Sequence, residues 1–139
     1  MPSMIVAPDY RPSEDEPFMN PVMLNYFREK LLRWRIELLS ESTETLAHLQ
    51  EGGLQEPDIA DRATVEADCS LELRTRDRER KLIAKIDAAL ERIENRTYGY
   101  CEVTGEPLSI RRLEARPIAT MSVEAQELHE RLERTHRED

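Results

Sequence analysis

The chain has 139 residues, a length that fits one ordinary domain or a small globule with an extension. Its net charge of −9 argues against general binding to nucleic acid, because neutralising phosphates requires clustered Lys and Arg. Charged residues make up 35% of the chain and aromatic residues 5%, so a compact core is poorly supplied and a long solvated helix is well supplied.

The two cysteines, Cys69 and Cys101, stand far apart, which does not suggest a disulfide framework and favours a reducing cytosol. The first ten residues lack the basic start and the apolar run of a signal peptide, and the uncharged apolar stretches are far shorter than a membrane span. We therefore expect a cytoplasmic protein without membrane contact. We expect Cys69 to be a structural thiol that lies on the seam of a helix.

The first 19 residues contain four prolines and an acidic run at positions 14–16. Proline fixes φ and has no backbone N–H, so this composition disfavours regular structure. We expect residues 1–19 to form a flexible N-terminal arm.

A long helix is predicted from residue 20 to about residue 50, where Gly52 and Gly53 end it. Asn20 can cap the first turn, and Pro21 suits the first helical position. Apolar residues recur at spacings of three and four, which places on one helix face Leu24, Phe27, Leu31, Trp34 and Leu38, prolonged by Leu39, Leu46 and Leu49.

A second long helix is predicted from about residue 63 to residue 95. Its seam is predicted to comprise Val65, Cys69, Leu73, Arg76, Arg80, Ile83, Ile86, Leu90 and Ile93. The middle is charged, but arginine stems can cover apolar surface while their heads stay in water. Two helices of similar length predict an antiparallel coiled-coil hairpin over residues 20–95, with its tip near 51–63.

Residues 96–139 are predicted to form a small C-terminal globule and a C-terminal helix, so the fold class is all-α. A turn signal at 104–107 follows segment 98–103, and Ser122 can cap the last helix. The small core is expected to comprise Leu108, Ile110, Leu113, Ile118 and Met121.

Four sequence runs point to one family: 61–63 (DRA), 70–86 (SLELRTRDRERKLIAKI), 98–101 (YGYC) and 110–117 (IRRLEARP). On these runs the chain resembles the DksA/TraR family over about residues 18–128. The resemblance implies a transcription regulator that binds RNA polymerase directly through its secondary channel, as a monomer and without direct DNA binding. It further implies that the protein modulates promoter-complex stability and initiation together with the alarmone ppGpp.

The globule departs from the family's pattern of two CxxC pairs that hold a zinc ion. Here the pairs read CEVT (101–104) and SVEA (122–125), so Cys101 remains while Thr104, Ser122 and Ala125 stand at the other three positions. Structural zinc requires about four nitrogen or sulfur ligands, so we expect no bound zinc and a degenerate zinc-finger-like globule held by apolar packing. His129 and His136 could serve as substitute ligands, but histidines on a surface helix are usually solvated.

The tip carries Asp58, Asp61 and Ala63 in the pattern Asp-x-x-Asp-x-Ala. From spacing alone, the carboxylates could simply stabilise a helix start through its free amides and dipole. The resemblance instead implies that these three residues contact the polymerase active centre. Catalytic use of the acids to hold a second magnesium is disfavoured, because two residues separate them.

Basic residues run along the second helix between positions 74 and 85, interspersed with acids. They form either a solvated face with weak ion pairs or a phosphate-contacting surface. The resemblance implies that Arg78, Leu82 and Lys85 line a ppGpp pocket shared with the polymerase. The family's basic residue just past its last cysteine is here Gln126, which predicts weaker coupling to ppGpp.

No nucleophile–base pair or phosphate-binding loop appears in the sequence, so an enzyme is not expected. Two alternatives to the family function stay open: a generic coiled-coil interaction protein, and an elongation factor that stimulates transcript cleavage. Polymerase binding separates the first alternative from the family function, and transcript cleavage separates the second.

Overall fold

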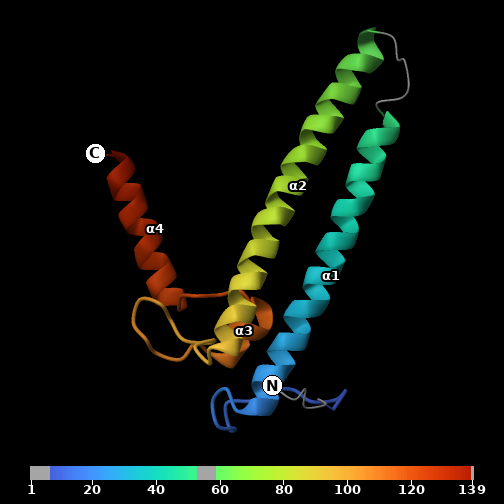
Figure 1. Cartoon of the computed structure of the whole chain (residues 1–139). Coiled ribbons are helices and arrows are strands. Elements are labelled where there is room, and N and C mark those ends of the chain that lie inside the picture. Colours follow the sequence, from blue (N-terminus) through green and yellow to red (C-terminus); the bar gives the residue numbers. More distant parts are fainter. Residues whose placement is uncertain (1–6, 53–58, 139) are drawn as a thin grey trace. The chain divides into compact units, whose positions relative to one another are not determined.

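The computed structural model describes residues 7–52 and 59–138. Its helices are α1 (Pro21–Gly52), α2 (Ile59–Glu94), α3 (Ile110–Ala115) and α4 (Val123–Glu138). Within these two ranges there is no β-strand, only an isolated bridge between Tyr100 and Pro107. The predicted all-α fold class is confirmed (Figure 1).

The helices divide between two compact units. The hairpin unit, Leu32–Ala88, contains the second part of α1 and most of α2, and the terminal unit comprises Met1–Leu31 and Ala89–Asp139. Within the hairpin unit the two helices run antiparallel and side by side, as Figure 1 shows. Arg35 Nε lies 2.7 Å from Asp87 Oδ1 and joins them. The predicted helical hairpin is therefore present.

The start of α1 follows from its capping residues. Asn20 Oδ1 accepts a hydrogen bond from the N–H of Met23 at 3.0 Å, and Pro21 has no N–H that would need a partner. The predicted seam residues from Leu24 to Leu38 are buried or half-buried, whereas Leu39 is 41% exposed. The side chains of Leu46 and Leu49 lie outside the described residues.

The second helix begins earlier than the sequence suggests. α2 starts at Ile59, four residues before the predicted start near Ala63. Proline restricts the residue before it and is tolerated at a helix start, so Pro57 does not prevent a helix from forming soon after it. Residues 59–62 contain no glycine or proline that would break the first turn.

The inward face of α2 differs from the predicted seam at two positions. A series of buried or half-buried residues follows strictly alternating spacings of four and three: Val65, Cys69, Glu72, Arg76, Glu79, Ile83, Ile86, Leu90 and Ile93. The prediction of Leu73 and Arg80 is wrong, since Leu73 is 49% exposed and Arg80 is also exposed, while Glu79 is 8% exposed. The period of the helix, rather than side-chain polarity, decides which residues face the partner helix.

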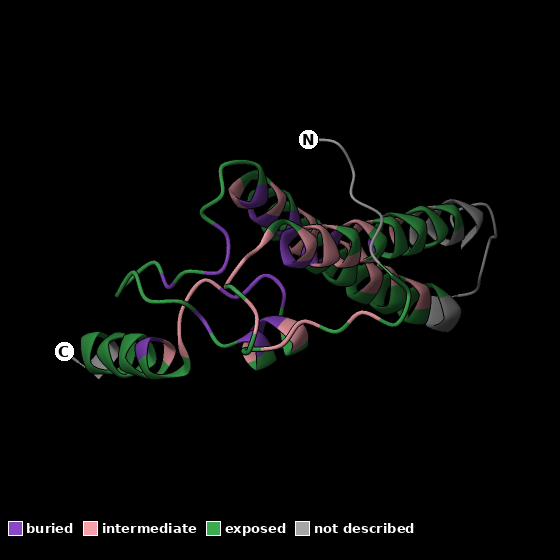
Figure 2. Ribbon diagram, turned by 90° about the horizontal axis from the view of Figure 1, so that it is seen from below, coloured by how far each residue is buried: buried purple, intermediate pink, exposed green. Residues whose placement is uncertain are grey.

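The terminal unit has a small apolar core of its own, seen in Figure 2 as purple segments. Tyr98 is 1% exposed, and its ring centroid lies 5.6 Å from that of Phe27. The Tyr98 hydroxyl donates to the carbonyl of Pro117 at 2.7 Å, and burial raises the pKa of this phenol well above its ordinary value. The predicted core residues Leu108, Ile110, Leu113 and Ile118 are buried, and Met121 is half-buried.

The described part of the N-terminal segment, residues 7–19, packs within the terminal unit. The Phe18 ring meets that of Tyr100 edge-on at 5.3 Å, and Tyr10 meets Tyr26 edge-on at 5.7 Å. The Tyr10 hydroxyl also bonds the Glu16 carboxylate at 2.9 Å. A flexible arm over residues 1–19 stays a prediction. In its described part, Tyr10 and Phe18 pack against aromatic rings of the terminal unit.

No helix in the part of the chain that the structure describes is both long enough and apolar enough to cross a membrane.

Candidate functional site

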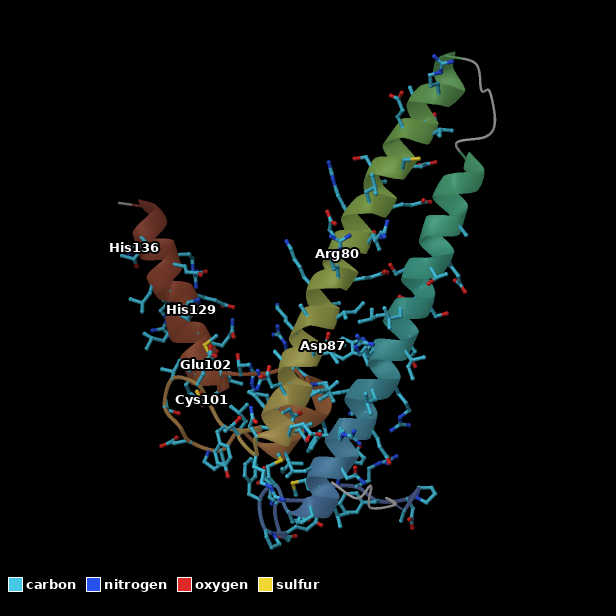
Figure 3. All side chains as sticks on the ribbon, viewed as in Figure 1. Arg80, Asp87, Cys101, Glu102, His129 and His136 are labelled. Atoms are coloured by element: carbon cyan, nitrogen blue, oxygen red, sulfur yellow. The ribbon has the colours of Figure 1, made fainter. Side chains whose placement is uncertain are left out.

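The knuckle, defined as residues 98–105 and 119–125 of the terminal unit, contains all four degenerate zinc positions. Cys101, labelled in Figure 3, is 2% exposed. Its Sγ accepts a hydrogen bond from the backbone N–H of Ser122 at 3.5 Å. The N–H of Glu102 donates to the carbonyl of Thr120 at 2.8 Å. These two bonds join the two halves of the knuckle directly.

The other three positions have local structural roles. Thr104 Oγ1 accepts from the N–H of Glu106 at 3.3 Å, which stabilises the turn after Cys101. Ser122 Oγ accepts from the N–H of Ala125 at 3.2 Å, so Ser122 caps α4 as the sequence predicts. Ala125 is 7% exposed and presents only a methyl group.

The environment of Cys101 favours its thiolate. Burial acts to raise the pKa of the thiol, but hydrogen bonds from the Thr104 hydroxyl and from the backbone amides of Ser122, Thr104 and Val103 act the other way. The bonds prevail and lower the pKa of Cys101 to about 6. Hydrogen-bond donors of the chain itself therefore stabilise the negative charge of the Cys101 thiolate.

Two further interactions hold the elements beside the knuckle. Arg112 Nε donates to the carbonyl of Met121 at 2.7 Å and so connects α3 to the second half of the knuckle. Lys30 Nζ donates to the Glu114 carbonyl at 2.7 Å and to Glu114 Oε2 at 2.8 Å, which connects α1 to α3. Arg112 and Glu114 both belong to the run at 110–117, but no local sequence pattern predicts these contacts.

The predicted tip residues are described only in part. Asp58 lies outside the described residues. Asp61 and Ala63 lie in the first two turns of α2, where Ala63 is exposed and the side chain of Asp61 is not described. The backbone thus places Asp61 and Ala63 at the N-terminal end of α2.

Three of the predicted ppGpp-pocket residues share one face of α2. Arg78, Leu82 and Lys85 are separated by four and three residues, and Arg78 and Lys85 are exposed while Leu82 is half-buried. This face therefore presents cationic side chains to solvent in the hairpin unit.

The fourth predicted pocket residue, Gln126, lies in α4 of the terminal unit. Its side-chain amide donates to Glu130 Oε1 at 3.2 Å. His129 and His136 are exposed along the same helix, and His129 Nε2 lies 3.1 Å from Glu133 Oε1. Each histidine is therefore on a solvated helix surface, whereas the sulfur of Cys101 is buried.

Two family models together match most of the chain. Residues 23–93 match the DnaK suppressor protein DksA, N-terminal domain, and residues 96–131 match the prokaryotic dksA/traR C4-type zinc finger. The RNA polymerase-binding transcription factor DksA of Caulobacter vibrioides is 63% identical over 136 residues, covering 98% of this chain and 96% of that relative. This chain belongs to the DksA/TraR family.

Other members support the same assignment. The RNA polymerase-binding transcription factor DksA of Escherichia coli (strain K12) is 45% identical over 121 residues, covering 87% of this chain and 80% of that protein. The solved structure of transcription factor DksA2 from Pseudomonas aeruginosa superposes with a TM-score of 0.80 at 38% identity, covering 86% of this chain and 95% of that one. The hairpin and the knuckle are therefore features of the DksA/TraR fold.

A C4-type zinc site does not fit the residues of this knuckle. The four positions supply one thiol, two hydroxyl groups and one methyl group, whereas structural zinc requires about four nitrogen or sulfur ligands. The Cys101 sulfur is already hydrogen-bonded, and both hydroxyl oxygens accept backbone N–H bonds. Among the residues that the structure describes, no group of three or more His, Cys, Asp or Glu side chains could hold a metal ion.

Proposed function

We propose that this chain is a cytoplasmic transcription factor that binds RNA polymerase directly and modulates promoter-complex stability and initiation. The observation that carries the proposal is the 63% identity, over nearly the whole of both chains, to a DksA named as RNA polymerase-binding. A TM-score of 0.80 to DksA2 supports the same assignment at the level of the fold.

The proposed mechanism is binding rather than bond chemistry. The hairpin enters the secondary channel of the polymerase, and Asp58, Asp61 and Ala63 at its tip contact the active centre. Such a contact changes initiation only if it differs between two conformations of the promoter complex. The position of Asp61 and Ala63 at the start of α2 is compatible with a role at the tip.

The proposal includes ppGpp as a co-regulator at the interface with the polymerase. Arg78, Leu82 and Lys85 form the chain's contribution on α2, where two exposed cations suit phosphate oxygens. Gln126 supplies a neutral amide instead of a cation, so coupling to ppGpp is weaker than with a basic residue there. The protein acts as a monomer without direct DNA contact and without bound zinc.

In vitro transcription from a ribosomal-type promoter with purified polymerase tests the function. Wild type is compared with Asp61→Asn, each with and without ppGpp. The variant loses a carboxylate from the tip with little change in size, so it is expected to bind the polymerase and fail to inhibit. Asp68→Asn is the matched control, since Asp68 is an exposed acid seven residues further along the same helix face.

The possible outcomes separate the alternatives. Inhibition by wild type and by Asp68→Asn, but not by Asp61→Asn, supports the proposal. If wild type neither binds polymerase nor changes transcription, the chain is a coiled-coil interaction protein with the same fold. Shortening of nascent transcripts by wild type identifies a cleavage factor instead.

A further inference from the structure

The hairpin unit buries a carboxylate in the middle of its helix pair. Glu79 of α2 is 8% exposed, and it is the one charged residue among the buried residues of the described part of the chain. Its Oε2 atom is buried without a hydrogen-bond partner, and no described cation pairs with the side chain. The described residues of the hairpin unit belong to α1 and α2, so among them α1 is the element that packs against the Glu79 face of α2.

From this carboxylate toward the tip, the next inward-facing residues of both helices are polar. Glu72 and Arg76 occupy the two preceding positions of the four-and-three series on α2, and both are half-buried. On α1, the half-buried residue that follows Leu38 is Ser42. The polar section of the seam therefore spans three successive positions of α2 and at least one position of α1.

The seam on the other side of this section is apolar. Leu38 of α1 is 6% exposed and Ile86 of α2 is fully buried, with Ile83 half-buried between Glu79 and Ile86. The Arg35–Asp87 ion pair also lies in this part of the hairpin unit. The hairpin unit therefore changes from an apolar to a polar seam within one helical turn.

The physical consequence is a difference in local stability. A polar residue at a single seam position of a coiled coil reduces its stability, and a buried carboxylate without a partner loses its hydration without compensation. Regions with few buried apolar contacts open locally at a lower free energy than the rest of a protein. The part of the helix pair toward the tip should therefore open more easily than the part around Leu38.

We propose that Glu72, Arg76 and Glu79 form a weak section of the hairpin, at which the helix pair opens locally on the side toward the tip while the apolar part stays paired. The opening is a property of the free chain and goes beyond the proposed function, because it needs no polymerase. Cys69 lies on the tip side of the weak section and is half-buried, so the opening increases the access of reagents to its thiol.

Native-state hydrogen exchange with peptide resolution tests the proposal on the full chain. In Glu79→Leu, the leucine replaces a buried charge with an apolar seam residue, so amides of residues 62–78 should exchange about tenfold more slowly. Amides of residues 84–94 should exchange at the wild-type rate. Alkylation of Cys69, followed by mass spectrometry on the same samples, should slow in parallel.

Asp77→Leu is the matched control. Asp77 is exposed and lies two residues from Glu79 on the same helix, so this variant also removes one negative charge and adds one leucine. Leucine forms helices about as well as glutamate and better than aspartate, so any gain in helix propensity is at least as large in the control as in Glu79→Leu. Slower exchange in Glu79→Leu but not in Asp77→Leu supports the weak section.

Equal slowing in both variants attributes the effect to helix propensity and overturns the proposal, as does unchanged or faster exchange in Glu79→Leu. Glu79→Gln keeps the shape of the side chain and provides a second readout if the leucine variant does not fold. Faster exchange in the glutamine variant means that the carboxylate stabilises the hairpin, which also overturns the proposal.

Discussion

At Cys101, one hydroxyl group and three backbone amides lower the pKa of a buried thiol from its ordinary value of 9.0 to about 6. A group whose pKa is lowered by folding stabilises the folded state fully above its unfolded pKa. The contribution of Cys101 is therefore complete above about pH 9, declines as the pH falls, and is absent below about pH 6. Between these limits the stability of the terminal unit should rise with pH.

Removal of the Thr104 hydroxyl tests this account. In Thr104→Val the thiolate loses its side-chain donor, so the pKa of Cys101 should rise by about one unit or more. The thiolate absorbance of Cys101 against pH, measured in a Cys69→Ser background, gives the midpoint. Thr97→Val is the control, because the Thr97 hydroxyl bonds the Arg92 carbonyl and not the sulfur. Equal midpoints in the two variants would contradict the assignment.

At the scale of elements, Phe18 and Met19 of the N-terminal segment pack against Gly99. Gly99 has φ +93°, and a Cβ built there would lie 2.9 Å from Met19 Cε and 3.1 Å from Phe18 Cζ. Gly105 also has a positive φ, +76°, but a Cβ there would meet no atom within 4 Å. A side chain would strain the backbone at either glycine, because both have a positive φ. Only at Gly99 would the new Cβ also meet side chains of the N-terminal segment.

This difference predicts unequal costs for two alanine substitutions. Gly99→Ala should destabilise the protein by about 1 kcal/mol more than Gly105→Ala, because the methyl group displaces the Phe18 ring and the flexible end of Met19. Denaturant unfolding of both variants measures the difference. Equal destabilisation would mean that residues 18 and 19 do not pack on the knuckle in solution.

The stability that the Lys30–Glu114 contact between α1 and α3 contributes should depend on pH. Burial acts to raise the pKa of the Glu114 carboxyl, but hydrogen bonds from Lys30 and Tyr26 outweigh it and lower the pKa below its ordinary value. A lowered pKa contributes stability above the ordinary value, and this contribution is lost as the pH falls through the folded pKa. The contact thus stabilises the fold at neutral pH and not in acid.

Glu114→Gln should therefore lower the free energy of unfolding by about 1 kcal/mol at neutral pH. The difference in free energy of unfolding between this variant and wild type should become smaller as the pH is lowered below the ordinary carboxyl pKa. Denaturant unfolding over a series of pH values measures this difference. Glu127→Gln is the control, because Glu127 is exposed on α4 beyond its first turn, away from the dipole of the helix N-terminus. A difference in free energy of unfolding that does not change with pH would exclude the ionisation of Glu114 as its cause.

At the scale of the whole molecule, the knuckle connects elements from both ends of the sequence without a metal site. Wild type should therefore keep its thermal unfolding midpoint in the presence of a strong chelator. A variant with Thr104→Cys, Ser122→Cys and Ala125→Cys restores four thiols and should bind one zinc ion, which makes its midpoint sensitive to chelator. Thr104→Cys alone, with two thiols, serves as control. A lower midpoint of wild type in chelator would contradict this account.

The sequence predicts the hairpin well because its long apolar series and its glycine pair are local signals. It places Leu73 and Arg80 on the seam wrongly, because hydrophobic character is a poor guide where the helical period brings Glu72 and Glu79 inward. The contacts of Phe18 and Met19 with Gly99 join residues about 80 positions apart, and no local pattern reports such a contact. Residue roles at the tip rest on family resemblance.

The division into two units also separates the chain's chromophores. The single tryptophan, Trp34, belongs to the hairpin unit, whereas all four tyrosines lie in the terminal unit: Tyr10, Tyr26, Tyr98 and Tyr100. Tryptophan fluorescence therefore follows the hairpin, and tyrosine absorbance follows the rest of the protein. One unlabelled sample in a single melting experiment can thus show whether the two units unfold together or in sequence.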